Sequence, residues 1–198
     1  GLEKIAGSLT KQVKADGVLD IYIADEADGG ISDGTGWKSP AGYDVRTRPW
    51  YKQAVAAGKD QIIFTAPFKS MVTGNTVILI ATTINNMDGK LLGVVAGEMD
   101  IGALSDYIVN LKIFGKGNGA LTLKSGVLVA YRIKEYVLTA NMTKDEKFPE
   151  PLRNVAKKMV SGETGFDTYT YQGEERQLFY TPTEHGFYLG ILYPVSEI

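Results

Sequence analysis

The chain has 198 residues, with 21 basic and 23 acidic side chains, a formal net charge of −2 and no cysteine. This length is sufficient for two small domains of about 100 residues, each with its own core. The near-neutral charge excludes the basic surface that nucleic-acid binding requires. The lack of cysteine excludes disulfides, thiol nucleophiles and thiolate metal sites.

The first predicted element is a helix within residues 1–16. Leu2, Ile5, Leu9 and Val13 recur there at three- and four-residue spacing. The pattern begins without a start signal and without a signal peptide. We therefore expect the chain to be a fragment of a longer protein.

A strand and a second helix follow. Residues 18–24 alternate in the manner of a strand, and residues 25–36 form a loop rich in Asp and Gly. Pro49 suits the first position of a helix and Gly58 suits its C-terminal cap. These signals predict a helix from Pro49 to Gly58.

Three predicted strands complete the first half, over residues 61–68, 75–85 and 91–99, and the last two are joined by a hairpin turn at 87–90. Their apolar segments have the length of strands and fall short of the roughly 20 residues that a membrane-spanning helix needs. The first half is thus predicted to be a strand, a helix and an antiparallel meander.

The second half repeats this outline without repeating the sequence. The predicted elements are a helix over 101–111, strands over 119–124 and 127–133, a helix over 151–160, and strands over 165–171, 176–181 and 186–193. The pattern predicts an α+β fold of two modules, each an antiparallel sheet flanked by helices, with an N-terminal helix. We expect that helix at 1–16 and the modules at 17–107 and 108–198.

One set of side chains in the first half suits a zwitterionic ligand. An arginine, an indole, two phenols and a carboxylate occur at Tyr43, Arg48, Trp50, Tyr51 and Asp100. A guanidinium and an indole N–H can hold a carboxylate, while an aspartate and aromatic faces can hold an ammonium. The helix start at Pro49 adds an anion site.

Each of these residues also has a structural interpretation. Arg48 could form a salt bridge with Asp44. Trp50 and Tyr51 point about 100° apart on a helix, and either could belong to the core. Asp100 could be the N-cap of the helix that follows.

The segment Asp44-Val45-Arg46-Thr47-Arg48-Pro49-Trp50-Tyr51 closely resembles the D-x-R-x-R-P-W-Y core of double Cache (dCache) sensor domains, which lie outside the membrane in bacterial chemoreceptors, histidine kinases and cyclases. The resemblance extends over Ala66-Pro67-Phe68, the turn at 74–76 and the strand that ends at Asp100-Ile101. It is close over residues 17–107 and holds in outline for the second half. It implies two PAS-like modules.

Within that family, the sequence resembles the subgroup that recognises amino acids. The resemblance implies that Arg48 and Trp50 hold a ligand carboxylate, and that Asp100 holds the ammonium with Tyr43 and Tyr51. Where many amino-acid binders have P-Y-x-D, this chain has Pro67-Phe68-Lys69-Ser70, so a phenol and a carboxylate are replaced. The expected ligand-binding residues are Tyr43, Arg48, Trp50, Tyr51, Phe68, Ser70 and Asp100.

The same resemblance implies the role of the domain. We expect the periplasmic ligand-binding domain of a methyl-accepting chemotaxis protein in the bacterial inner membrane. In the full-length receptor it would be dimeric and attached through membrane spans absent from this chain. Its ligand, an amino acid or related amine, would bind in the membrane-distal module. Two alternatives stay open: the sensor of a histidine kinase or diguanylate cyclase, and a ligand that is a carboxylate or amine other than an amino acid.

Other classes of function are less well supported. An enzyme is not expected, because no nucleophile is presented with a base. Neither a metal nor another cofactor is expected, since His185 is the only histidine and Asp25 to Gly30 lacks the calcium-loop spacing. A protein-interaction surface would need Trp37, Trp50 and Tyr51 to form an exposed cluster.

The second half is expected to bind no ligand of its own. Its candidate cavity-facing side chains are Tyr131, Tyr169 and Tyr180, which lie on predicted strands. The sequence shows no helix start like that of Arg48 and Trp50 nearby, and therefore no convergent charged site.

Overall fold

The computed structural model describes residues 1–195, and the chain divides into two units between Ile101 and Gly102. This division falls at the start of helix α3 (Ile101–Val109), whereas the expected boundary between residues 107 and 108 lies inside that helix. Residues 196–198 of the expected second module lie outside the described residues.

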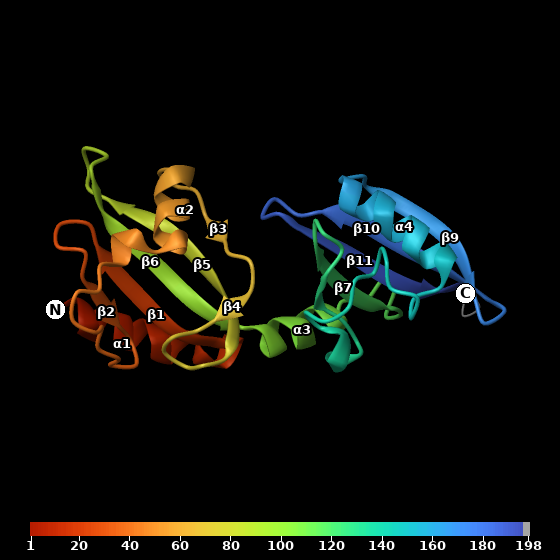
Figure 1. Ribbon diagram of the computed structural model, residues 1–198, viewed down its shortest axis with the longest axis horizontal. Helices are drawn as coiled ribbons and strands as arrows, with labels where there is room; N and C mark the ends of the chain where they lie inside the picture. The colour runs from red at the N-terminus through yellow and green to blue at the C-terminus, as the bar shows by residue number, and fades with distance from the viewer. Residues whose placement is uncertain (196–198) are drawn as a thin grey trace. The chain divides into compact units, whose positions relative to one another are not determined.

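The first unit is an antiparallel sheet with helices packed against it (Figure 1). Its elements are α1 (Leu2–Val13), the 3-10 turn η1 (Lys14–Asp16), β1 (Val18–Asp25), β2 (Ile31–Asp33), η2 (Val45–Thr47), α2 (Pro49–Ala57), β3 (Ile63–Phe64), β4 (Phe68–Lys69), β5 (Thr76–Asn85) and β6 (Leu91–Asp100). The strands pair in the order β2-β1-β6-β5-β3, and β4 pairs with another part of β5.

Alternation along the long strands places one apolar face under α2. Leu79 and Ala81 of β5 share a buried cluster with Trp50 and Ala54 of α2. Helix α2 begins at Pro49 and is followed by Gly58, whose φ of +90° suits glycine. The expected helix is therefore confirmed, and packing of its apolar side fixes the helix start above the sheet.

Two strand predictions in the first unit differ from the structure. The expected strand over 61–68 is divided into β3 and β4, because Pro67 has no N–H to donate to a neighbouring strand. The loop expected over 25–36 contains β2, which pairs with β1 through Tyr22 and Asp33. A three-residue strand beside glycines gives too short an alternation to be recognised in the sequence.

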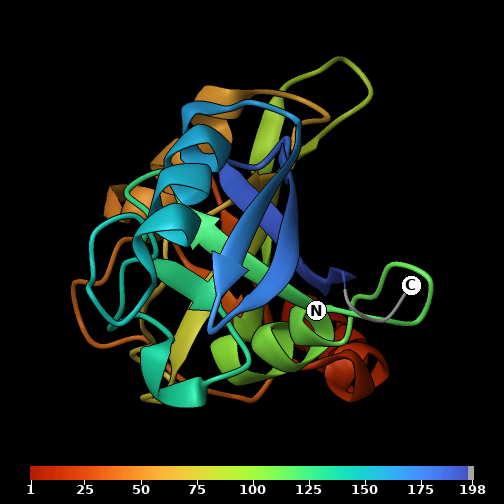
Figure 2. The ribbon, with the colours of Figure 1, turned by 90° about the vertical axis from the view of Figure 1, so that its right-hand side faces the viewer.

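The second unit is built on its own antiparallel sheet of order β8-β7-β11-β10-β9. After α3 its elements are β7 (Asn118–Leu123), β8 (Leu128–Ala130), η3 (Lys134–Tyr136), α4 (Glu150–Ser161), β9 (Gly165–Tyr171), β10 (Glu174–Pro182) and β11 (Phe187–Pro194). Helix α4 runs along one face of this sheet (Figures 1 and 2), with Leu152, Val155, Ala156 and Met159 in the core.

Together these elements confirm the expected α+β class with two sheet-based modules and an N-terminal helix. Among the described residues, none of the helices combines the length and the apolar character needed to cross a membrane. The described part of the chain also holds no group of three or more His, Cys, Asp or Glu side chains arranged to bind a metal ion.

Candidate functional site

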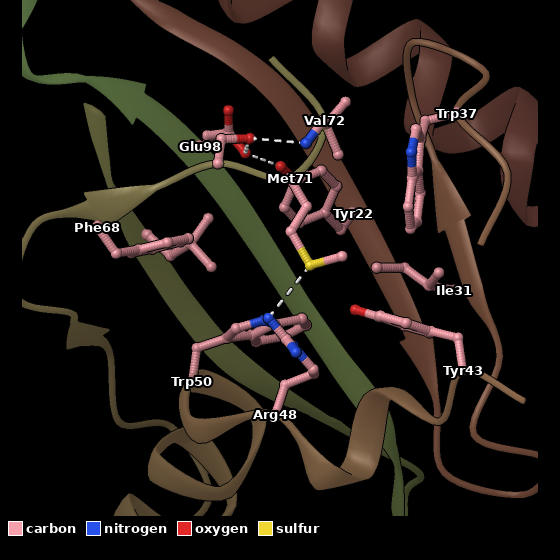
Figure 3. Close-up of a pocket in the computed structure, with 12 residues that line it drawn as sticks. Tyr22, Ile31, Trp37, Tyr43, Arg48, Trp50, Phe68, Met71, Val72 and Glu98 are labelled. Atoms are coloured by element: carbon pink, nitrogen blue, oxygen red, sulfur yellow. Dashed lines mark hydrogen bonds between the residues drawn. The ribbon is translucent and has the colours of Figure 1, made fainter. Parts of the chain in front are cut away.

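A cavity with an empty volume of about 390 Å3 lies on the face of the first sheet that carries α2 (Figure 3). Strands β1, β2, β5 and β6 form its floor, and the start of α2 and the loops around it form its walls. The lining residues are Tyr22, Ile31, Trp37, Tyr43, Arg48, Trp50, Phe68, Ser70, Met71, Val72, Leu79 and Glu98. Five of the residues singled out from the sequence are therefore brought together: Tyr43, Arg48, Trp50, Phe68 and Ser70.

Arg48 immediately precedes α2 and brings a positive charge to the cavity. Its Nε is buried without a hydrogen-bond acceptor, and its Nη2 lies 3.4 Å from the sulfur of Met71. Its guanidinium carbon is 5.8 Å from the ring centre of Tyr43, a cation–π distance. Within residues 1–195 no carboxylate forms an ion pair with Arg48, so the guanidinium has hydrogen-bonding capacity for a ligand.

Asp44 is paired with the other arginine of the motif. The Asp44 carboxylate accepts a hydrogen bond of 2.7 Å from Nη2 of Arg46, and Nη1 of the same guanidinium donates to the backbone oxygen of Glu26 at 2.9 Å. This pairing holds the pKa of Asp44 below its usual value. The alternative of a salt bridge between Arg48 and Asp44 is therefore wrong: Arg46 pairs with Asp44, whereas Arg48 lines the cavity.

Trp50 and Tyr51 point in different directions, as their adjacent positions on a helix require. The Trp50 ring lines the cavity and packs 6.4 Å from the ring of Tyr22. Tyr51 is not among the lining residues, and its hydroxyl donates to Glu26 at 2.6 Å. Burial and this hydrogen bond raise the pKa of Tyr51. Both rings are buried, at 8% and 3% exposure, which argues against an exposed interaction cluster with Trp37.

A carboxyl group lies at the far side of the cavity from Arg48, and it belongs to Glu98 of β6 (Figure 3). Glu98 is 1% exposed and accepts hydrogen bonds from Ser70 and Thr73, each at 2.9 Å, and from the hydroxyl of Tyr22. Burial, reinforced by the charge of Asp20, raises the pKa of Glu98 to about 7. Glu98 can therefore gain or lose its proton near neutral pH.

Asp100 lies two residues further along β6 and is not among the residues that line the cavity. It is the last residue of the strand, opposite Val77 of β5, and it directly precedes α3. Strand alternation gives Glu98 and Asp100 the same face of the sheet, so periodicity alone did not separate them. The deeper position of Glu98 in the strand is what brings its carboxyl group to the cavity.

Two buried carboxyl groups, Glu98 and its cross-strand neighbour Asp20, should make the stability of the fold depend on pH. Burial, a hydrogen bond with Asp33 and the charge of Asp33 raise the pKa of Asp20 to about 7. Between about pH 4 and pH 7 the folded chain then binds more protons at Asp20 and Glu98 than the unfolded chain does, so stability rises as pH falls.

We expect the melting temperature to increase from about pH 8 to about pH 5, and to increase less in Asp20→Asn, whose amide can replace the protonated carboxyl group. Thermal denaturation of both proteins across this range measures the effect. An equally steep pH dependence in the variant would show that Asp20 does not titrate in this window.

The loop after β4 contributes Ser70, Met71 and Val72 to the lining of the cavity. Ser70 accepts backbone hydrogen bonds from Val72 and Thr73, each at 3.1 Å, which fixes the loop above Glu98. Met71 is 59% exposed and extends across the cavity between Glu98 and Arg48 (Figure 3). Trp37 packs edge to face on Tyr43 at 5.8 Å.

Sequence reasoning missed seven lining residues: Tyr22, Ile31, Trp37, Met71, Val72, Leu79 and Glu98. Glu98 was detectable, since an acidic residue within an otherwise apolar strand is costly unless it is paired or functional. The others are ordinary core or loop residues in the sequence, and only tertiary packing brings them to one cavity.

Comparison with known proteins gives a consistent family assignment. Residues 2–198 match the model of the Cache domain family. The chemotaxis protein McpA of Pseudomonas putida is 28% identical over 91% of the chain, and McpB of Bacillus subtilis is 31% identical over 92%. Both relatives are named methyl-accepting chemotaxis proteins, and the chain spans about a quarter of their length, 26% and 25%.

Two solved ligand-binding domains of chemoreceptors have a similar fold. One is that of PctC from Pseudomonas aeruginosa in complex with GABA, with 26% identity, a TM-score of 0.67, and coverage of 96% of this chain and 80% of that one. The other is that of CtaA from Pseudomonas fluorescens in complex with L-serine, with 24% identity, a TM-score of 0.68, and coverage of 97% and 79%. At 24% identity the second comparison supports the fold alone.

Proposed function

This chain belongs to the Cache domain family, and from that premise we propose that its first unit binds an amino acid or a related small molecule with an amine and a carboxylate. Its relatives are chemoreceptors, so the chain is a sensor domain and not an enzyme. The observation that carries the ligand proposal is the pair formed by Arg48 and Glu98, which face one cavity from opposite sides (Figure 3).

The chemistry of this pair matches the two ends of an amino acid. The Arg48 guanidinium has an unpaired buried Nε and can donate to a carboxylate, beside the uncapped start of α2. The Glu98 carboxyl group is buried, and a ligand ammonium would compensate for the cost of ionising it. The rings of Tyr22, Tyr43 and Trp50 provide faces for the cation and for the body of the ligand.

The ammonium contact is therefore proposed at Glu98. The family resemblance implied Asp100 in this role, but Asp100 is not among the residues that line the cavity, and we propose Glu98 in its place. Tyr51 is not proposed as a ligand contact either, because it is not among the lining residues and its hydroxyl donates to Glu26. The GABA complex of PctC supports a ligand with both an amine and a carboxylate.

The setting of the domain is also a proposal. We place it in the periplasm as part of an inner-membrane chemoreceptor, with the first unit as the membrane-distal module, dimerisation in the full-length protein and spans outside this chain. Ligand would signal by its differential affinity for two conformations of the receptor. The two relatives are named methyl-accepting chemotaxis proteins, which supports the chemotaxis assignment over a histidine kinase or cyclase.

Calorimetric titration with amino acids and their matched analogues tests the ligand class. Each L-amino acid, and GABA, is compared with the carboxylic acid that lacks the amine and with the amine that lacks the carboxylate. We expect each analogue to bind at least about tenfold more weakly, since a charge-assisted hydrogen bond is lost. Equal affinity for the deaminated acids would refute the zwitterion proposal and favour a simple carboxylate receptor.

Met71 should limit the size of the ligand. Its sulfur contacts Arg48 at 3.4 Å, so a ligand carboxylate must move this side chain to reach the guanidinium. We expect Met71→Ala to leave the melting temperature nearly unchanged, because the residue is 59% exposed, and to improve binding of large amino acids relative to small ones several-fold. An unchanged ratio of leucine to alanine affinity in calorimetry would show that Met71 does not restrict the cavity.

A further inference from the structure

The second unit contains a cavity of its own, with an empty volume of about 450 Å3, between the sheet and the start of α4. Its walls are strongly aromatic, with the rings of Tyr131, Tyr136, Phe148, Tyr169 and Tyr171. The rings of Tyr131 and Tyr136 are stacked at 6.0 Å, and Phe148 meets both edge to face. These surfaces suit an apolar or planar ligand body.

Three basic side chains line the same cavity: Arg132, Lys147 and Arg176. Nε of Arg176 is buried without a hydrogen-bond acceptor among the described residues. Nε of Arg48 in the first unit is in the same situation. The Arg176 guanidinium lies 5.4 Å from the ring centre of Tyr171, and Lys147 lies 4.6 Å from that of Tyr136. Aromatic contacts thus hold two of the cations at the cavity wall.

No aspartate or glutamate is among the described residues that line this cavity, in contrast to Glu98 in the first unit. Two of the cations pair with acids that are not among the lining residues: Glu174 pairs with Arg176 at 2.8 Å, and Asp145 lies 3.8 Å from Lys147. A neighbouring open cavity is lined by Arg132, Arg176 and two lysines, with Glu174 as its one acid among the described residues, so basic side chains outnumber acidic ones there as well. The site has the charge for an anion and lacks the group that would hold an ammonium.

The phenols add neutral donors. Tyr131 and Tyr169 are each 4% exposed, and burial raises the pKa of both, that of Tyr169 to about 12. They are therefore protonated at physiological pH, and their O–H groups can donate to a carboxylate oxygen. Tyr169 of β9 is paired in register with Arg176 of β10, which places phenol and guanidinium together.

These contacts contradict the premise on which a ligand-free second half was expected. From the sequence, no charged side chains were expected to converge on Tyr131, Tyr169 and Tyr180. In the structure, Arg132, Lys147 and Arg176 line the same cavity as Tyr131 and Tyr169. Strand pairing brings Arg176 there, and the segment before α4 brings Lys147. Tyr180 alone is outside the cavity lining, and its hydroxyl donates to Asp167 at 2.7 Å.

We propose that this second cavity binds a small organic carboxylate without an amine, with Arg176 and Lys147 holding the anion and the aromatic walls holding an apolar body. The site is separate from the amino-acid site of the first unit and does not depend on it. A receptor with both sites would respond to two chemical classes of ligand.

The test is calorimetric titration of the Arg48→Ala chain, in which the first site is disabled, with benzoate, butyrate and acetate, and with sulfate as an inorganic anion. We expect saturable binding of benzoate that is tighter than that of acetate, because the aromatic walls favour an apolar body. Arg176→Gln should weaken this binding by about tenfold or more, Lys147→Ala by a smaller factor, and Lys157→Ala, an exposed control on α4, not at all.

Three results would overturn the proposal. The first is no saturable binding of any of the three carboxylates at about ten millimolar. The second is sulfate binding as tightly as benzoate, which would indicate a general anion site. The third is unchanged benzoate affinity in both Arg176→Gln and Lys147→Ala. Lys147 is exposed, so its variant is informative even if Arg176→Gln proves unstable.

Discussion

Replacing Arg48 by alanine is expected to lower the affinity for the amino-acid ligand by about two decades or more while leaving the fold intact. The guanidinium can form two charge-assisted hydrogen bonds to a carboxylate, each worth roughly 1.5–3 kcal/mol. The side chain makes no ion pair among the described residues, so its loss removes little native stabilisation. Calorimetric affinity and melting temperature are measured on the same preparation.

Two matched variants make the result specific. Arg48→Lys retains the positive charge but lacks the parallel N–H donors of the guanidinium, so it should bind the ligand with intermediate affinity. Lys52→Ala changes an exposed residue of the same helix and should bind as the wild type does. Wild-type affinity in Arg48→Ala would exclude the carboxylate contact. A loss of affinity accompanied by an equal loss in Lys52→Ala would point to a general change in α2.

Replacing Glu98 by glutamine should lower the affinity by about one to two decades, because the amide retains the shape of the carboxylate but not the charge that pairs with the ligand ammonium. In the wild type, affinity should also rise with pH through about 7, since bound ammonium favours the ionised form of Glu98 and binding then releases a proton. In Glu98→Gln this part of the pH dependence should disappear.

Asp100→Asn is the matched control on the same strand. Asp100 is outside the cavity lining, so we expect wild-type affinity in this variant. The opposite pattern, with a large loss of affinity in Asp100→Asn and none in Glu98→Gln, would show that Asp100 and not Glu98 contacts the ammonium. Titration of both variants at about pH 6 and pH 8 separates the two assignments.

The fold could be predicted where local signals and packing agree. Pro49 and Gly58 mark the ends of α2, and alternation over β5 and β6 marks the central strands, because both patterns reflect burial of one face against the core. Short strands such as β2 were missed, since three residues carry too little periodicity and their pairing depends on β1.

The candidate site could be predicted in part. Arg48 and Trp50 belong to one compact motif at a helix start, so their shared cavity follows from local sequence. Glu98 and Tyr22 come from distant strands, and their approach depends on sheet pairing that sequence spacing does not reveal. The cations of the second unit were missed for the same reason, because Arg176 meets Tyr169 across two strands.

A crystal structure of the chain with the amino acid that binds most tightly in the titration panel tests the zwitterion site most directly. We expect the ligand in the first-unit cavity, with its carboxylate oxygens within about 3.2 Å of the Arg48 guanidinium and its ammonium within about 3.2 Å of a Glu98 carboxylate oxygen. A ligand bound there in the reverse orientation, or one in contact with neither Arg48 nor Glu98, would contradict the proposed recognition.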